Sequence, residues 1–235
     1  MRSRNLLAIF SICLAASGAH AQGMPFAPPQ NVLQLSATGT VEVQQDLLVL
    51  SLTTTREGAD ANTVQSQLKT ALDAALTEAR KAAVAGQLDV RTGQFGLYPR
   101  YSRDGKISGW HGTAELVLEG RDFPRITQTA ARIQTLTLGS TSFGLSREQR
   151  AKVEGEAQAI AIERFKAKAG ELAKGFGFTG YSLREVSVNA NDQGFAPRPR
   201  MMAMEAKAAQ AEMPVPVEAG KSTVVVTVSG SVQLK

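Results

Sequence analysis

Cysteine and histidine are almost absent from this sequence. Its 235 residues include one cysteine, Cys13, and two histidines, His20 and His111. Structural zinc sites draw several ligands from these two residue types. Nucleophilic serine and cysteine residues are usually activated by a histidine base. Most metal sites and most covalent catalysis are therefore excluded, and His111 is the one remaining candidate for an ordinary base or a nitrogen ligand.

The first 21 residues have the pattern of a secretory signal peptide. Arg2 and Arg4 form a short positive region, an apolar run follows over residues 6–16, and Ala19 to Ala21 form an A-x-A cleavage pattern. The apolar run is too short for a membrane-spanning helix, which needs about 20 residues. We therefore expect cleavage after Ala21 and export.

Without residues 1–21 the chain has no cysteine and a net charge of +3, from 24 basic and 21 acidic residues. An exported chain without cysteine needs no disulfide. The small net charge gives no reason to expect a nucleic-acid partner, and no later segment is long and apolar enough to span a membrane as a helix. We predict a flexible, Pro-rich leader over residues 22–32 and a single domain over 33–235.

The first half of this domain switches between two periodicities. Apolar and polar residues alternate over residues 33–43, and a more apolar run over 47–55 predicts a second, more central strand. Over residues 60–85 the apolar residues recur at spacings of three and four, which predicts an amphipathic helix. Asp60 is the expected N-cap of this helix and Gly86 its expected terminator.

A hairpin is predicted next. Residues 88–101 and 107–119 flank a tight-turn signal, Asp104-Gly105. One face of the second strand is expected to carry Trp110, Ala114, Leu116 and Leu118. His111 falls on the opposite, polar face together with Thr113, Glu115 and Glu119.

The second half resembles the first in its order of elements, without a visible sequence repeat. The expected elements are a short helix that starts after Asp122 with Pro124 in its first turn, a strand over 137–145, a long helix from Ser146 to the glycines Gly175 and Gly177, a strand over 181–189, and a strand from Thr223 to the last residues. Ser146 and Gln149 are interpreted as a reciprocal capping box. The predicted fold is α+β, with two long helices and one short helix packed on one side of a mostly antiparallel sheet.

No set of catalytic residues can be assembled from these elements. No G-x-S-x-G occurs, and an exposed histidine on a sheet is the simplest interpretation of His111. The acidic residues are scattered over helix surfaces and strand edges, and no pair is marked as the two carboxylates of a glycoside hydrolase. We therefore expect no enzyme, no catalytic residue and no cofactor, with a hydrolase that uses an unmarked carboxylate pair as the alternative.

Basic residues cluster in two stretches, over residues 98–106 and 197–201. Tyr98, Tyr101 and Trp110 lie near the first stretch, and a basic and aromatic surface can bind nucleic acid or lipid headgroups. The interpretation we favour here is a hairpin tip that carries solvated charge.

Four of the six methionines lie between residues 198 and 220, and three of them are Met201, Met202 and Met204. Thioethers are soft ligands for Cu(I) and can be oxidised reversibly, so these three are weak metal-ligand candidates. Flanking prolines bar a continuous strand or a long helix. We predict a mobile insertion over about 190–220, with methionines that suit an adaptable contact surface.

Three regions of the chain resemble the SIMPL-domain family. They are "SATGTVEVQQDLLVLSLTTTREGADA" (36–61), "LYPRYSRDGKISGWHGTAELVLEGRDF" (97–123), and "PRMMAMEA" (199–206) followed by "VEAGKSTVVVTVSGSVQL" (217–234). The family includes the periplasmic immunogenic proteins and the oxidative-stress-defense proteins of Gram-negative bacteria. One departure is visible, because the family often has Pro-Asp where this chain has Gln45-Asp46.

The resemblance implies an α+β fold, a periplasmic or outer-membrane-associated location, and ring-like or channel-like homo-oligomers in some members. It brings no catalytic residue, so none is carried over. The function we expect is that of a non-enzymatic exported protein, linked to envelope or oxidative stress, that acts as a homo-oligomer; an envelope protein is a further candidate partner. The alternative is oxidant scavenging or Cu(I) binding through residues 201–213.

Overall fold

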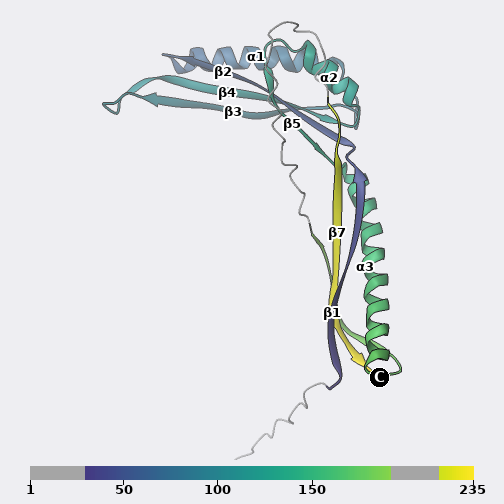
Figure 1. The fold of residues 1–235 in the computed structure, drawn as a ribbon. Coiled ribbons are helices and arrows are strands. Elements are labelled where there is room, and N and C mark those ends of the chain that lie inside the picture. The colour runs from purple at the N-terminus through teal and green to yellow at the C-terminus, as the bar shows by residue number, and fades with distance from the viewer. Residues whose placement is uncertain (1–29, 192–216) are drawn as a thin grey trace, which may run out of the picture.

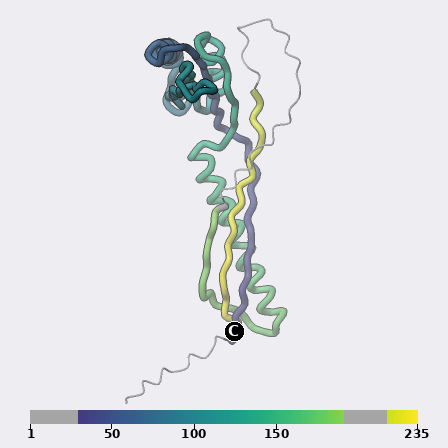
Figure 2. Tube along the Cα trace, turned by 90° about the vertical axis from the view of Figure 1, so that its left-hand side faces the viewer, coloured from purple at the N-terminus to yellow at the C-terminus, as the bar shows by residue number. Residues whose placement is uncertain are grey.

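Residues 30–191 and 217–235 are described by a computed structural model, in which two antiparallel sheets form two parts of one elongated molecule (Figures 1 and 2). The elements of these residues are β1 (Val32–Gln44), β2 (Leu47–Gly58), α1 (Ala61–Lys81), β3 (Asp89–Tyr101), β4 (Ile107–Gly120), α2 (Phe123–Arg132), β5 (Thr137–Gly144), α3 (Arg147–Gly175), β6 (Tyr181–Asn191) and β7 (Lys221–Leu234).

The head consists of the four-stranded sheet β3-β4-β2-β5 with α1 and α2 on one face. Helix α1 forms because Asp60 caps it, accepting a 2.8 Å hydrogen bond from the backbone N–H of Thr63. Its apolar stripe, including Val64 and Leu68, packs on Leu50 and the other inward residues of β2 and β4. None of the helices in the described part of the chain covers the opposite face of this sheet (Figure 1).

The stalk consists of the three-stranded sheet β1-β7-β6 with α3 along one face. Alanines on α3, among them Ala157 and Ala161, are fully buried against the strands. Gly39 of β1 makes this close approach feasible, because a Cβ at that position would lie 1.9 Å from the carbonyl oxygen of Ala157. A backbone contact of this kind replaces the larger side chains that separate most helices from their sheets.

Three segments meet at the elbow between head and stalk: residues 44–46 and 144–146, which connect the two parts along the chain, and residues 217–222, which lead into β7. Asp46 accepts hydrogen bonds from the backbone N–H of Ser146 (2.7 Å) and from its hydroxyl (2.6 Å). The Gln45 N–H donates to the carbonyl oxygen of Gly220 at 3.0 Å, a bond that proline could not make. The departure from Pro-Asp at this position therefore adds a backbone link between two of the three segments.

The order of elements and the α+β class agree with the sequence prediction, and three details are corrected. The strands form two sheets instead of one, because β1 pairs with β7 in an unbroken register while β2 pairs with β4 and β5. Helix α1 ends at Lys81, before the predicted position, and Gly86 lies with φ +71° in the turn that follows. The predicted capping box at Ser146 is half formed, because the hydroxyl accepts from the Gln149 N–H while the Ser146 N–H donates to Asp46.

Of the predicted insertion over 190–220, residues 190 and 191 belong to β6 and residues 217–220 lead into β7, whereas residues 192–216 lie outside the described part of the chain. Met201, Met202 and Met204 are among them. The described helices include none that is both long enough and apolar enough to cross a membrane.

Candidate functional site: the open edge of the stalk

Among the described strands, β6 forms one edge of the stalk sheet and pairs only with β7. Its residues Leu183, Val186 and Val188 pair with β7 residues that face α3, so they project on the same side of the sheet as the helix. They are nevertheless 55%, 44% and 44% exposed, because α3 packs mainly on β1 and β7. The stalk therefore presents an apolar row beside an unpaired strand edge.

The opposite edge of the same sheet, on β1, is occupied. The guanidinium of Arg164 donates to the carbonyl oxygen of Thr38 at 2.8 Å, and the Lys168 ammonium donates to that of Ser36 at 3.1 Å. Both cations come from α3, and they bind the outward carbonyls that an added strand would need. Blocking an edge with charged side chains is a common protection against unwanted strand pairing.

A β-bulge divides β6 near its start. The register with β7 shifts between Leu183 and Glu185 and is then continuous to Asn191. Gly230 of β7 pairs with Val186 just after the bulge, and a Cβ on Gly230 would come within 2.2 Å of the Glu185 carbonyl oxygen. Only glycine fits this position without a shift of the backbone, so the bulge and its glycine together set the path of the edge strand.

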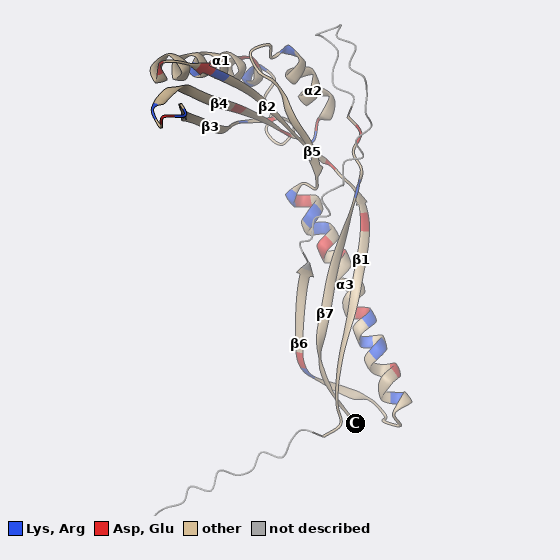
Figure 3. Ribbon diagram, turned by 60° about the vertical axis from the view of Figure 1, so that its left-hand side comes forward, with Lys and Arg blue, Asp and Glu red and all other residues tan. Residues whose placement is uncertain are grey.

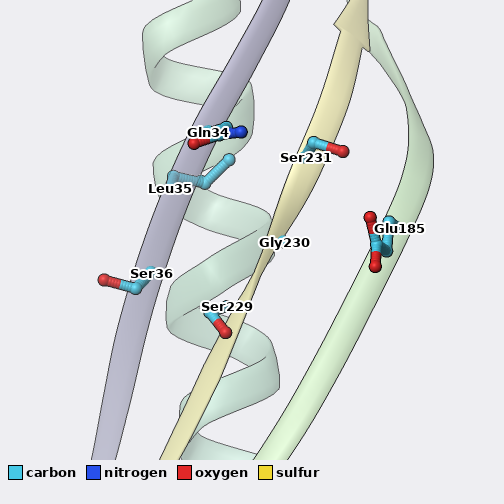
Figure 4. Close-up of a pocket in the computed structure, with 7 residues that line it drawn as sticks. All are labelled: Gln34, Leu35, Ser36, Glu185, Ser229, Gly230 and Ser231. Atoms are coloured by element: carbon cyan, nitrogen blue, oxygen red, sulfur yellow. The ribbon is translucent and has the colours of Figure 1, made fainter.

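The stalk face away from α3 carries mainly hydroxyl and amide side chains, with the ion pair of Glu42 and Lys221 near the elbow. Toward the end of the stalk farther from the elbow, this face has an open depression of about 450 Å³ across β1, β7 and β6 (Figure 4). Its lining residues are Gln34, Leu35, Ser36, Glu185, Ser229, Gly230 and Ser231. Hydroxyls, an amide and one carboxylate can form hydrogen bonds to a neutral polar partner.

His111 lies on the polar face of the head sheet, as its strand pattern predicts. Its Nδ1 is 3.3 Å from Glu57, which also forms an ion pair with Arg100. On the same face Glu115 accepts hydrogen bonds from the backbone N–H of Gln94 (2.9 Å) and from the Ser51 hydroxyl. These two hydrogen bonds, the Gln94 bond foremost, lower the pKa of the Glu115 carboxyl.

The carboxylates of Glu57 and Glu115 therefore each have partners of their own, and they do not pair with each other. In the described residues no three or more His, Cys, Asp or Glu side chains gather closely enough to hold a metal ion. The weak ligand candidates Met201, Met202 and Met204 are outside these residues.

One glycine pattern escaped the sequence reasoning. Gly175, Gly177 and Gly180 have the G-x-G-x-x-G spacing of nucleotide-binding loops. Such loops bind phosphate because they open a helix and aim its N–H groups at the ligand. Here the glycines close α3, and Gly177 has φ +83° just after the helix ends. The structure thus supports the interpretation of Gly175 and Gly177 as a helix stop.

The open edge was also missed. The sequence predicts a strand over residues 181–189, but Leu183 and Val186 are three residues apart and lie on one face only because of the bulge between them. No local sequence pattern indicates that Arg164 and Lys168 donate hydrogen bonds to the backbone of β1, more than a hundred residues earlier in the chain.

A comparison with protein-family models matches the family described as "SIMPL: Protein of unknown function (DUF541)" over residues 33–232. No protein with a curated description matches the chain. The match covers the head and the stalk, from Leu33 in β1 to Val232 in β7. The chain therefore belongs to the SIMPL (DUF541) family.

Proposed function

We propose that this chain is a non-enzymatic exported protein of the bacterial envelope, and that it acts as a homo-oligomer assembled through β6. The observation that carries the proposal is the contrast between the two edges of the stalk sheet. Cations from α3 occupy the β1 edge, whereas the β6 edge is open and lies beside exposed apolar side chains. Open strand edges of this kind pair readily with another chain.

The edges of the head sheet are less suited to pairing. Strand β3 has two register shifts and contains Pro99, which lacks an N–H. Strand β5 has eight residues and a register shift of its own. By contrast, β6 continues without interruption from Glu185 to Asn191. Among the described strands, β6 therefore offers the most regular free edge.

A second copy of this chain is the partner that we favour. Two identical edges can pair antiparallel about a two-fold axis, which makes the contact self-complementary. The strand carries one cation and one anion, Arg184 and Glu185, so two copies bring no net charge together. Pairing would also place the apolar rows of the two copies next to each other and remove part of their surface from water.

The envelope location rests on the signal-peptide pattern of residues 1–21. The family resemblance implies a role in envelope or oxidative stress. In that role, an assembly without catalytic residues would act as a scaffold.

Native mass spectrometry of the protein purified after export tests the proposal. We expect an oligomer for the wild type and a monomer for the double variant Val186→Lys/Val188→Lys, because the two ammonium groups would be desolvated at the contact. Leu138→Lys is the matched control, since Leu138 is an exposed apolar residue on an edge strand of the head, and this variant should assemble normally. A monomeric wild type at micromolar concentration would remove the proposal.

A further inference from the structure

The β3–β4 hairpin ends in a second exposed apolar group. Tyr101 and Ile107 are partners across the last rung of the hairpin and are 65% and 54% exposed. Tyr98, three residues before Tyr101 in β3, is half exposed. We use the name hairpin tip for these three residues and the turn 102–106. Exposed large apolar side chains gathered in this way mark interaction surfaces more often than isolated ones do.

The hairpin tip is also basic. Arg103 and Lys106 are exposed in the turn, and no hydrogen bond or ion pair is found for either side chain within the described residues. Arg100, by contrast, is held by Glu57. Asp104 is the one acidic residue in the turn. Two unpaired cations therefore stand directly beside Tyr101 and Ile107.

The position and backbone of the tip favour contact with a flat partner. The hairpin projects from the end of the head farthest from the stalk (Figures 1 and 3). Its turn is closed by hydrogen bonds from the Ser102 N–H to the Lys106 carbonyl (2.7 Å) and from the Gly105 N–H to the Ser102 carbonyl (3.0 Å). Gly105 adopts φ +73°, as a tight turn needs. No other part of the head reaches past this turn in the view of Figure 1.

We propose that the hairpin tip is a contact site for a membrane surface that carries anionic phospholipid headgroups. Tyrosine is suited to the boundary between headgroups and acyl chains, where its ring is in an apolar environment and its hydroxyl remains hydrated. Ile107 adds apolar area beside it. Arg103 and Lys106 supply the charge that anionic headgroups attract. The tip combines both kinds of contact on one rigid turn, and this proposal does not depend on assembly through β6.

The experiment uses the protein purified after export and two kinds of vesicle, one of phosphatidylglycerol with phosphatidylethanolamine and one of phosphatidylcholine alone. Trp110 is the only tryptophan in the chain and lies three residues from Ile107, so its fluorescence reports on the tip. Binding is measured by vesicle flotation, and the emission of Trp110 is followed in parallel. We expect the wild type to bind the anionic vesicles and to bind the neutral ones less.

Two variants separate the contributions. Tyr101→Ser/Ile107→Ser should weaken binding to the anionic vesicles about tenfold through lost apolar contact. Arg103→Gln/Lys106→Gln should weaken it about 25-fold, at about fivefold per cation, and should erase the preference for anionic lipid. Phe176→Ser is the matched control, because Phe176 is 63% exposed at the far end of α3; its binding should equal that of the wild type.

Two outcomes would overturn the proposal. One is a wild type that stays in solution with both kinds of vesicle, which would leave a protein partner as the explanation for the tip. The other is binding that the two tip variants retain in full, which would place the membrane contact elsewhere. Circular dichroism and native mass spectrometry of each variant show whether its fold and its oligomeric state are unchanged.

Discussion

Asp46 accepts two hydrogen bonds from Ser146, although 100 residues separate them: one from its backbone N–H at 2.7 Å and one from its hydroxyl at 2.6 Å. The pair joins the corner between β1 and β2 to the first turn of α3. It also satisfies an N–H that the predicted capping box would have assigned to Gln149. The head is therefore fastened to the stalk by an ionisable side chain that contacts a helix cap.

Replacing Asp46 with alanine removes both bonds at once. We expect the variant to lose about 2 kcal/mol of unfolding free energy, because hydrogen bonds to a charged acceptor are stronger than neutral ones. Urea unfolding monitored by circular dichroism measures this loss. Asp60→Ala removes a cap that serves α1 alone and should cost about 1 kcal/mol; equal losses in the two variants would argue against a special role for the elbow.

Gly39 in β1 and Gly155 in α3 provide a matched pair of glycines in the stalk. Gly39→Ala would drive a methyl group into the backbone of Ala157 and Ala161, and we expect a loss of about 3 kcal/mol. Gly155→Ala meets open space on α3 and should be neutral or stabilising by up to about 1 kcal/mol, since alanine favours helix. Thermal unfolding of the two variants checks the difference, and a tolerated Gly39→Ala would contradict the close packing of α3 on β1.

Gln45 tests the departure from the common family pattern. Gln45→Pro loses the N–H that donates to Gly220 and the amide that donates to Ser222 at 3.0 Å, whereas Gln45→Ala loses only the second. The proline variant should be less stable than the alanine variant by about 1 kcal/mol, the net contribution of one hydrogen bond. Urea unfolding of both proteins decides this, and a more stable proline variant would mean that the backbone bond contributes little.

Local signals in the sequence predicted the order of the elements and most of their ends, because caps depend on neighbours in the chain. Asp60 and Asp122 cap their helices, as expected, with backbone N–H groups three residues ahead. The pairing of β1 with β7 could not be predicted in this way, since Val32 pairs with Gln233 at the other end of the chain. The division into two sheets follows from that long-range choice.

The candidate site was out of reach for the same reason. A strand over residues 181–189 was predictable, but the bulge places Leu183 on the same face as Val186 and Val188. The exposure of this face depends on where α3 crosses the sheet, which no spacing within residues 181–189 encodes. The β1 edge is blocked by Arg164 and Lys168. From the sequence alone, these two residues look like ordinary solvated charges on a helix.

The pH dependence of stability should include a contribution from Glu115. Its folded pKa is lowered by the hydrogen bonds from Gln94 and Ser51. The stabilisation is therefore complete above the ordinary glutamate pKa of about 4.3 and is lost as the pH falls through the lower folded value. Glu115→Gln should destabilise the protein at pH 7 and should differ less from the wild type as the medium is acidified into the range below that ordinary pKa. A destabilisation that stays constant with pH would show that the charge is not involved; unfolding curves over this pH range supply the comparison.

Cysteine cross-linking across β6 tests the proposed assembly most directly. The chain beyond residue 21 has no cysteine, so a single introduced thiol can form a disulfide only with another copy. We compare Leu183→Cys, Val186→Cys and Val188→Cys under mild oxidation, with Leu138→Cys on β5 as the control. Pairing of two β6 strands predicts a disulfide-linked dimer for at least one β6 position, the one nearest the two-fold axis, and none for the control. If all three β6 variants remain uncross-linked while the protein is oligomeric, the subunits do not meet edge to edge along β6.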